Sequence, residues 1–215
     1  MGIIEKGING PFKGKAGSVV GSSWKKISYI KGLQRKKGVK RTPSPDQATQ
    51  QEKFKALNRF FSPLARILEV GFRQYLAKAT GVNMAFSMNY DHAFLPAGDS
   101  MVLNYSALQL SHGSLFTAGA EKAWVDNGKI TVTWHTKTYG MGGALDDVAY
   151  AIAYSASTDI FFSDEHRATR HEGIVHIDLI GEVPDGNLHV WLFFADKAGK
   201  RVSKTVYIPL SAKGS

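Results

Sequence analysis

The chain of 215 residues contains no cysteine. This absence excludes disulfide bonds, thiolate nucleophiles and zinc sites built on cysteine. No apolar run approaches the roughly 20 residues that cross a bilayer, and the N-terminus lacks the apolar core of a secretory signal peptide. We therefore expect no membrane span and no signal peptide, and a cytoplasmic or virion-associated protein.

Catalytic motifs are lacking as well. No Gly-x-Ser-x-Gly nucleophile motif occurs, and the stretch GKAGSVVG at 14–21 matches neither the phosphate-binding P-loop nor the dinucleotide fingerprint. We expect its glycines to serve turns, bulges and close backbone contacts. The chain is 43% apolar and 21% charged, which is typical of a folded globular protein. We expect a folded protein with neither enzyme activity nor a cofactor.

Acidic residues are scarce in the N-terminal part. Residues 1–80 hold 17 Lys and Arg against four acidic residues, whereas residues 81–215 hold ten basic and 14 acidic ones. The densest basic run extends from Lys31 to Arg41 and contains no acidic residue. Such a run either binds a polyanion or forms a solvated basic loop. The candidates for polyanion binding are Lys13, Lys15, Lys25, Lys26, Arg35, Lys36, Lys37, Lys40 and Arg41.

Residues 7–33 carry six glycines among β-branched and aromatic residues, a pattern that predicts short strands with tight turns. A helix should follow, because Ser44 is suited to cap it, Pro45 to its first turn and Gln47 to a capping box. An apolar stripe at helical spacing predicts that this helix covers residues 45–61: Phe54, Leu57, Phe60 and Phe61.

The next part of the chain has weaker signals. Ser62 and Pro63 repeat the cap-plus-proline pattern, so the chain kinks or starts a second helix there, and Gly81 is suited to end it. The segment NMAFSMNYDHAF suggests a short helix, and VLNYSALQLS alternates weakly like a strand. We treat residues 82–118 as a connector.

From residue 122 onward, short alternating runs are separated by turn residues, which is typical of an antiparallel β-sandwich. Ile130, Val132 and Trp134 share one strand face, and we expect Trp134 in the core. The nearly continuous apolar run HVWLFFAD predicts a central strand. The predicted fold is α+β: a basic N-terminal β-hairpin plus helical segment at 1–81, the connector at 82–118, and an antiparallel immunoglobulin-like sandwich at 119–215.

A histidine-rich segment invites a metal hypothesis. His166, His171 and His176 lie among four acidic residues within residues 164–178. The spacing from His171 to His176 is one residue too long for the helical His-Glu-x-x-His zinc motif. A weak metal site stays open beside the interpretation as a polar loop leading into a strand, and we assign no metal ligands.

Several segments resemble an uncharacterised family of Bacteroidota proteins, a domain of unknown function: GPFKGKAGSVVGSSWKKISYIKGL, PDQATQQEKFKALNRFFSPL, ILEVGF and NMAFSMNYDHAF. The motifs that carry the resemblance are Gly-Lys-x-Gly-x-Val-Val-Gly-x-x-Trp, from Gly14 to Trp24, and Ser62-Pro63-Leu64. The resemblance covers nearly the whole chain and implies no activity or ligand. Separately, Trp134 followed by Tyr150 and Tyr154 resembles a fibronectin type III sandwich, which implies adhesion or assembly only weakly.

These observations favour a noncatalytic structural or interaction protein that docks or assembles through its basic, glycine-rich N-terminal module and presents the sandwich. A phage or another large particle is one setting for it. The partner would be another protein or a second copy of the chain. The alternative is a nonspecific nucleic-acid-binding protein that uses the basic segment 13–41.

Overall fold

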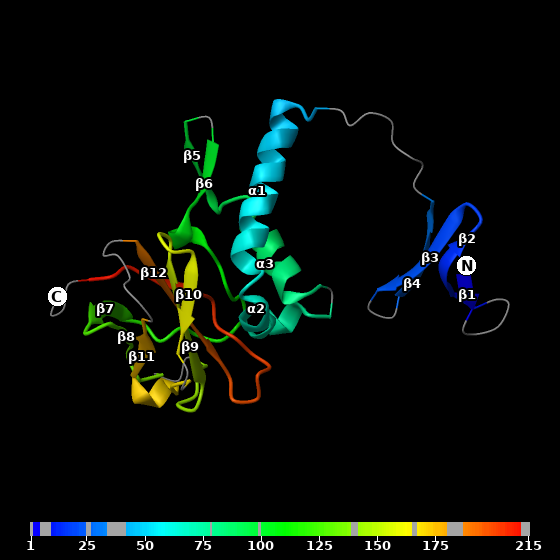
Figure 1. Ribbon diagram of the computed structural model, residues 1–215. Helices are drawn as coiled ribbons and strands as arrows, with labels where there is room; N and C mark the ends of the chain where they lie inside the picture. The colour runs from blue at the N-terminus through cyan, green and yellow to red at the C-terminus, as the bar shows by residue number, and fades with distance from the viewer. Residues whose placement is uncertain are drawn as a thin grey trace. The chain divides into compact units, whose positions relative to one another are not determined.

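The computed structural model describes residues 2–4, 10–24, 27–33, 42–77, 79–98, 100–138, 142–164, 167–179 and 187–211. Its elements confirm the predicted α+β class, with an N-terminal sheet followed by helices and antiparallel sheets (Figure 1). The chain divides into two units, residues 1–43 and residues 44–215. The charge distribution predicted a boundary at residue 81, which would group the helical segment with the N-terminal strands. The contacts group that segment with the second unit instead.

The first unit is an antiparallel sheet in the order β1-β2-β3-β4. Its strands are Gly2–Ile4 (β1), Phe12–Ala16 (β2), Val19–Trp24 (β3) and Ile27–Gly32 (β4). Gly17 has a φ of 59° in the turn from β2 to β3, a conformation that glycine adopts without strain. A Cβ atom on Gly21 would lie 2.0 Å from the carbonyl oxygen of Phe12. Glycine is therefore required for a turn at one position and for a close backbone contact at the other.

The second unit begins with a layer of helices. These are Pro45–Phe61 (α1), Ala65–Gly71 (α2) and Gly81–Asn89 (α3), with 3₁₀ turns at Arg73–Tyr75, Tyr105–Ala107 and Arg170–Glu172. Helix α1 begins and ends as predicted. The hydroxyl of Ser44 accepts a hydrogen bond from the Gln47 N–H, and the Gln47 side chain accepts one from the Ser44 N–H. This reciprocal pair is the predicted capping box.

The start of α2 differs from the prediction. Its N-cap is Leu64, and no side chain caps it. Ser62 does not cap α2 because its hydroxyl donates to the carbonyl of Asn58 within α1. The Ser62 hydroxyl, which was predicted to cap α2, therefore bonds to the preceding helix instead.

Gly81 begins α3 and does not end a helix. The Thr80 hydroxyl caps α3 by accepting a hydrogen bond from the Asn83 N–H. A Cβ atom at Gly81 would lie 2.5 Å from the Leu68 main chain, so glycine permits α3 to approach α2 closely. Only the first two residues of VLNYSALQLS lie in a strand, so the strand prediction for this segment is mostly wrong: Ser100–Leu103 (β6) pairs with Phe94–Ala97 (β5), and a 3₁₀ turn follows.

Two further antiparallel sheets pack face to face. Their strands are Lys122–Asp126 (β7), Lys129–Thr133 (β8), Val148–Ser155 (β9), Ile160–Ser163 (β10), Ile174–Asp178 (β11), Leu188–Ala195 (β12) and Val206–Ile208 (β13). One sheet has the order β10-β9-β12-β13 and the other β11-β8-β7. Strand β12 is central, as predicted. A single apolar cluster contains side chains from both sheets, including Val132 and Val190, so the pair forms a sandwich.

The sheet that contains β9 is apolar on both faces. Alternate residues of β9 join either the sandwich core or the cluster beneath the helices: Ala149, Ala151 and Ala153 on the sandwich side, Tyr150, Ile152 and Tyr154 on the helix side. Helices α1, α2 and α3 lie on one side of this sheet, and β7, β8 and β11 lie on the other (Figure 1). The second unit therefore has three layers.

Trp134 lies in the sandwich core, as predicted. It is 6% exposed, and its ring meets that of Phe194 edge to face at 5.5 Å between centroids. Its Nε1 donates a hydrogen bond to the carbonyl of Arg170 at 3.0 Å. The indole is thus buried with its polar atom satisfied.

Candidate functional site

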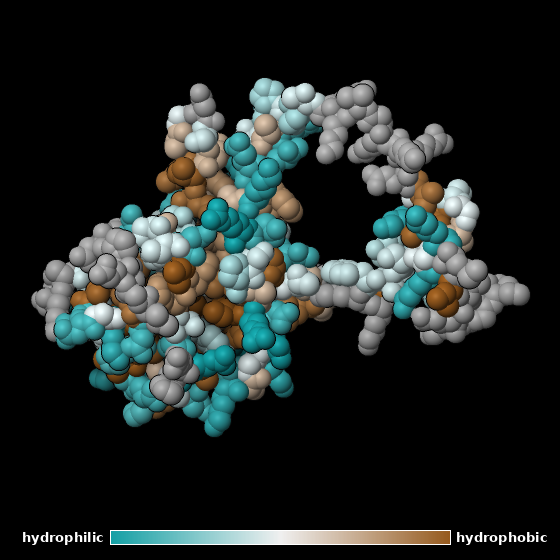
Figure 2. Space-filling model, viewed as in Figure 1, coloured by the Kyte–Doolittle hydropathy of each residue, from teal (hydrophilic) through white to brown (hydrophobic). Residues whose placement is uncertain are grey.

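Strand register assigns the side chains of the N-terminal sheet to two faces. Direct cross-strand partners share a face, as do residues two apart along one strand. Val20 of β3 pairs with both Lys15 and Lys31. The face that contains them combines lysines with apolar and aromatic side chains and one serine, and we call it the lysine–aromatic face: Ile3, Lys13, Lys15, Val20, Ser22, Trp24, Ile27, Tyr29 and Lys31. Apolar and hydrophilic residues lie side by side on this unit in Figure 2.

The lysine–aromatic face contains two of the nine residues predicted to bind a polyanion, Lys13 and Lys15. The other seven lie outside the described residues: Lys25, Lys26, Arg35, Lys36, Lys37, Lys40 and Arg41. The register adds Lys31 from the basic run and places Tyr29 on the same face. Charge counting could not find this combination, because it depends on how the strands pair.

Strand β4 forms an edge of the N-terminal sheet. All six of its residues are exposed, and Ile27 and Ile30 are each 65% exposed. An edge strand presents backbone N–H and C=O groups that can pair with another chain, and apolar side chains favour such pairing. The β4 edge and the lysine–aromatic face together form the candidate docking surface.

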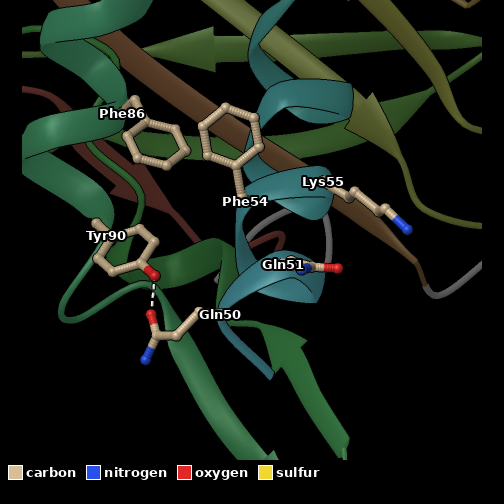
Figure 3. Close-up of a pocket in the computed structure, with 6 residues that line it drawn as sticks. All are labelled: Gln50, Gln51, Phe54, Lys55, Phe86 and Tyr90. Carbon is tan, nitrogen blue, oxygen red and sulfur yellow. Dashed lines mark hydrogen bonds between the residues drawn. The ribbon is translucent and has the colours of Figure 1, made fainter. Parts of the chain in front are cut away.

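An open groove lies between α1 and α3 in the second unit (Figure 3). Its volume is about 550 Å³, and its walls are mostly apolar. Phe54 was predicted to belong to the buried stripe of α1, but it is 54% exposed and lies 4.9 Å from the Phe86 ring between centroids. The Tyr90 hydroxyl donates to Oε1 of Gln50 at the rim. With so few polar groups, the groove has little chemistry to select a ligand.

A buried ion pair joins Arg170 to Asp147, whose side chains are 2% and 1% exposed. Arg170 Nε lies 3.1 Å from Asp147 Oδ2, and its Nη2 donates to the Phe116 carbonyl at 2.8 Å. Leaving one partner of such a pair alone costs about 3 to 5 kcal/mol. The pair therefore fixes the segment before β9 against the segment before β11.

Asp159 ties α1 to the turn between β9 and β10. Its carboxylate accepts a hydrogen bond from the Tyr154 hydroxyl at 2.8 Å and pairs with the Arg59 guanidinium. The bond from Tyr154, followed by that from Arg59, lowers the pKa of Asp159. Burial, followed by the bond to Asp159, raises the pKa of the Tyr154 hydroxyl. The Arg59 pair adds an exposed polar contact to the apolar cluster that packs the helices on this sheet.

The histidine-rich segment does not gather metal ligands in the described part of the chain. His171 lies on a 3₁₀ turn and His176 on β11, where its Nδ1 lies 3.1 Å from the Thr131 hydroxyl. His166 lies outside the described residues. Among the residues described, no group of three His or acidic side chains could hold a metal ion.

The fold defines an α+β protein in which a helix layer and a β-sandwich follow a separate exposed sheet. A family model described as "Family of unknown function (DUF6266)" matches residues 11–209, and the chain belongs to this family. The resemblance to a domain of unknown function is thereby confirmed, while the Bacteroidota origin stays a prediction. No curated protein and no solved structure matches the chain. No helix in the described ranges is long and apolar enough to cross a membrane.

Proposed function

We propose that this chain is a noncatalytic docking or assembly protein. Its N-terminal sheet pairs through β4 with an edge strand of a partner chain, and the lysine–aromatic face packs against that partner. The observation that carries this proposal is the exposure of Ile27, Tyr29 and Ile30 on an edge strand. One form of this function is that of a component of a phage or another large particle. The protein would then lie in the virion, and otherwise in the cytoplasm.

The N-terminal sheet lacks a buried core among its described residues, and this supports the same proposal. The two buried apolar clusters of the structure contain no residue of this unit among those described. A single sheet without a core is marginally stable in water. Covering an exposed isoleucine contributes about 1.5 to 3 kcal/mol, so a partner that covers Ile27 and Ile30 would stabilise the sheet.

The second unit supports the role of a scaffold, and we propose that its sandwich is immunoglobulin-like in the manner of fibronectin type III. Counted along the chain from β7 to β13, the first, second and fifth strands form one sheet. An immunoglobulin constant domain adds the fourth strand to that sheet, whereas here it lies beside the third. Only one strand changes sheets between the two arrangements. The architecture hosts many functions, so it supports a scaffold without naming a partner.

Light scattering over a concentration series tests the assembly. We expect the full chain to associate, and the double substitution Ile27→Lys and Ile30→Lys to weaken association at least about tenfold, because charge on an edge strand opposes pairing. Deleting residues 1–33 should act in the same way. The control is Ile174→Lys, compared with each single substitution of β4, because it places one lysine at an exposed apolar position of another edge strand, β11. A protein that stays monomeric at every concentration and is unchanged by the deletion would contradict assembly.

The lysine–aromatic face also supports a second function, nonspecific binding to nucleic acid. Lysines contact phosphates and aromatic rings stack on bases, and Lys13, Lys15 and Lys31 share their face with Tyr29. If about six basic residues of segment 13–41 contact phosphates, the logarithm of affinity should fall with the logarithm of salt concentration at a slope of about −5.

Gel-shift titrations with duplex and single strands separate the two functions. Replacing Lys13, Lys15 and Lys31 by alanine should make the salt slope shallower by about 3 units. Replacing three exposed lysines of the second unit, Lys129, Lys197 and Lys200, is the matched control. If no shift occurs at low salt, the chain does not bind nucleic acid.

A further inference from the structure

A small polar pocket lies beside the buried Arg170–Asp147 pair. Its volume is about 80 Å³, and its lining residues are Phe116, Thr117, Ala118, Lys137, Thr138, Gly143 and Arg170. A cavity of about 10 to 15 Å³ holds one buried water, so this pocket has room for a group of a few heavy atoms.

The Arg170 guanidinium is held rigidly at this pocket. Asp147 binds Nε, and the Phe116 carbonyl accepts from Nη2. The Phe194 ring centroid lies 4.1 Å from the guanidinium carbon, and a Cβ atom on Gly143 would lie 3.1 Å from the same carbon. Nη1 makes no hydrogen bond within the described ranges of the chain. Nη1 is therefore the donor that remains for a ligand, and the surrounding contacts keep the guanidinium from rotating.

We propose that this pocket binds one small oxyanion, a phosphate or a carboxylate. Arg170 Nη1 donates charge-assisted hydrogen bonds to it, and the Thr117 and Thr138 hydroxyls can donate from the walls. Asp147 balances the charge of Arg170, so the net positive charge comes from Lys137 on the exposed side. With one such exposed charge, we expect a dissociation constant on the order of 1 mM.

The indole of Trp134 reports on the pocket, because its Nε1 donates to the Arg170 carbonyl. In the ¹⁵N-labelled full chain, we expect the Trp134 indole resonance to shift saturably with inorganic phosphate or with acetate at constant ionic strength. The Trp191 indole, which donates to the Tyr105 carbonyl, should stay in place. A response to phosphate identifies a phosphoryl group as the ligand, and a response to acetate alone identifies a carboxylate.

Two lysine variants make the test specific. Lys137→Ala removes the charge at the pocket and should weaken binding about tenfold, with an unchanged melting temperature because Lys137 is exposed. Lys129→Ala removes an exposed lysine from the same sandwich and should leave the affinity unchanged. The proposal is overturned if neither anion shifts the Trp134 indole saturably, or if both variants weaken binding equally.

Discussion

Trp134 fills the space between the two sheets of the sandwich, in contact with Phe194. Truncating it removes a large apolar group, leaves a cavity and deprives the Arg170 carbonyl of its indole donor. We expect Trp134→Ala to lower the free energy of unfolding of the second unit by about 3 to 5 kcal/mol. Urea denaturation followed by circular dichroism measures this loss.

Trp124→Ala is the control for Trp134→Ala, since Trp124 on β7 is only half-buried and should cost less. Iodide quenching provides a second check on the native protein. If iodide reached the Trp134 indole and the alanine variant were as stable as the parent, the inward orientation of Trp134 would be wrong.

Burial of single residues could be predicted where it follows from spacing along the chain. Trp134 continues the alternation of Ile130 and Val132, so its strand face was evident from the sequence. Arg170 gave no such signal, because its partners Asp147 and Phe116 are 23 and 54 residues away. Contacts over such separations depend on the packing of the sheets, which local patterns do not report.

At the level of elements, α1 contacts the turn that carries Asp159 through the exposed Arg59–Asp159 pair. Asp159 has a φ of 58°, which asparagine also tolerates, so Asp159→Asn removes the charge without changing the backbone. Because folding lowers the pKa of Asp159, its carboxylate stabilises the folded state at pH values above the ordinary pKa of about 3.9. That contribution is lost as the pH falls through the lower folded-state pKa.

We therefore expect the parent to have a higher melting temperature than Asp159→Asn at neutral pH, and we expect this difference to disappear in acid. The effect should be small, because Arg59 and Asp159 are both exposed. Thermal melts over a pH series measure it, and Asp178→Asn, in an exposed pair with Lys129, controls for the lost charge. A difference that grew on acidification would contradict the assignment.

Helix boundaries were predictable where the capping partners are local. The Ser44 cap of α1 has its partner three residues away in Gln47, and both ends of this helix lie where the sequence predicted them. Ser62 carries the same sequence signal, but its hydroxyl has the Asn58 carbonyl of the preceding turn within reach. A hydroxyl between two helices can bond either to a carbonyl of the preceding helix or to an N–H of the following one. The sequence does not show which of these two hydrogen bonds forms.

For the whole molecule, the two units differ in charge and in core. Residues 1–43 hold 11 of the 27 basic and one of the 18 acidic residues, which leaves 16 basic and 17 acidic residues in the second unit. Both buried clusters belong to the second unit among the residues described. We expect residues 44–215 alone to unfold cooperatively at the melting temperature that the full chain shows for this unit.

Calorimetry of the two proteins measures this, and cation-exchange chromatography should show that the shortened chain no longer binds the resin at neutral pH. If residues 44–215 failed to unfold cooperatively, the N-terminal sheet would be part of the fold of the second unit.

The overall class and the central strand β12 followed from the sequence, but the three-layer arrangement did not. Charge grouped the helices with the basic N-terminal strands, whereas Phe60 and Leu68 pack with Trp191 beneath the helix layer. An amphipathic helix shows only that it covers something apolar. Which sheet it covers depends on matching shapes, and net charge along the chain carries no information about that.

The alternation of alanine with large side chains makes β9 sensitive to the parity of any change in its length. A three-nucleotide deletion in the coding sequence of this strand would turn Tyr150 or Tyr154 into the sandwich and an alanine toward the helices. A six-nucleotide deletion would shorten the strand but return the remaining residues to their proper faces. Among length variants of β9, those that lose one residue should therefore be less tolerated than those that lose two.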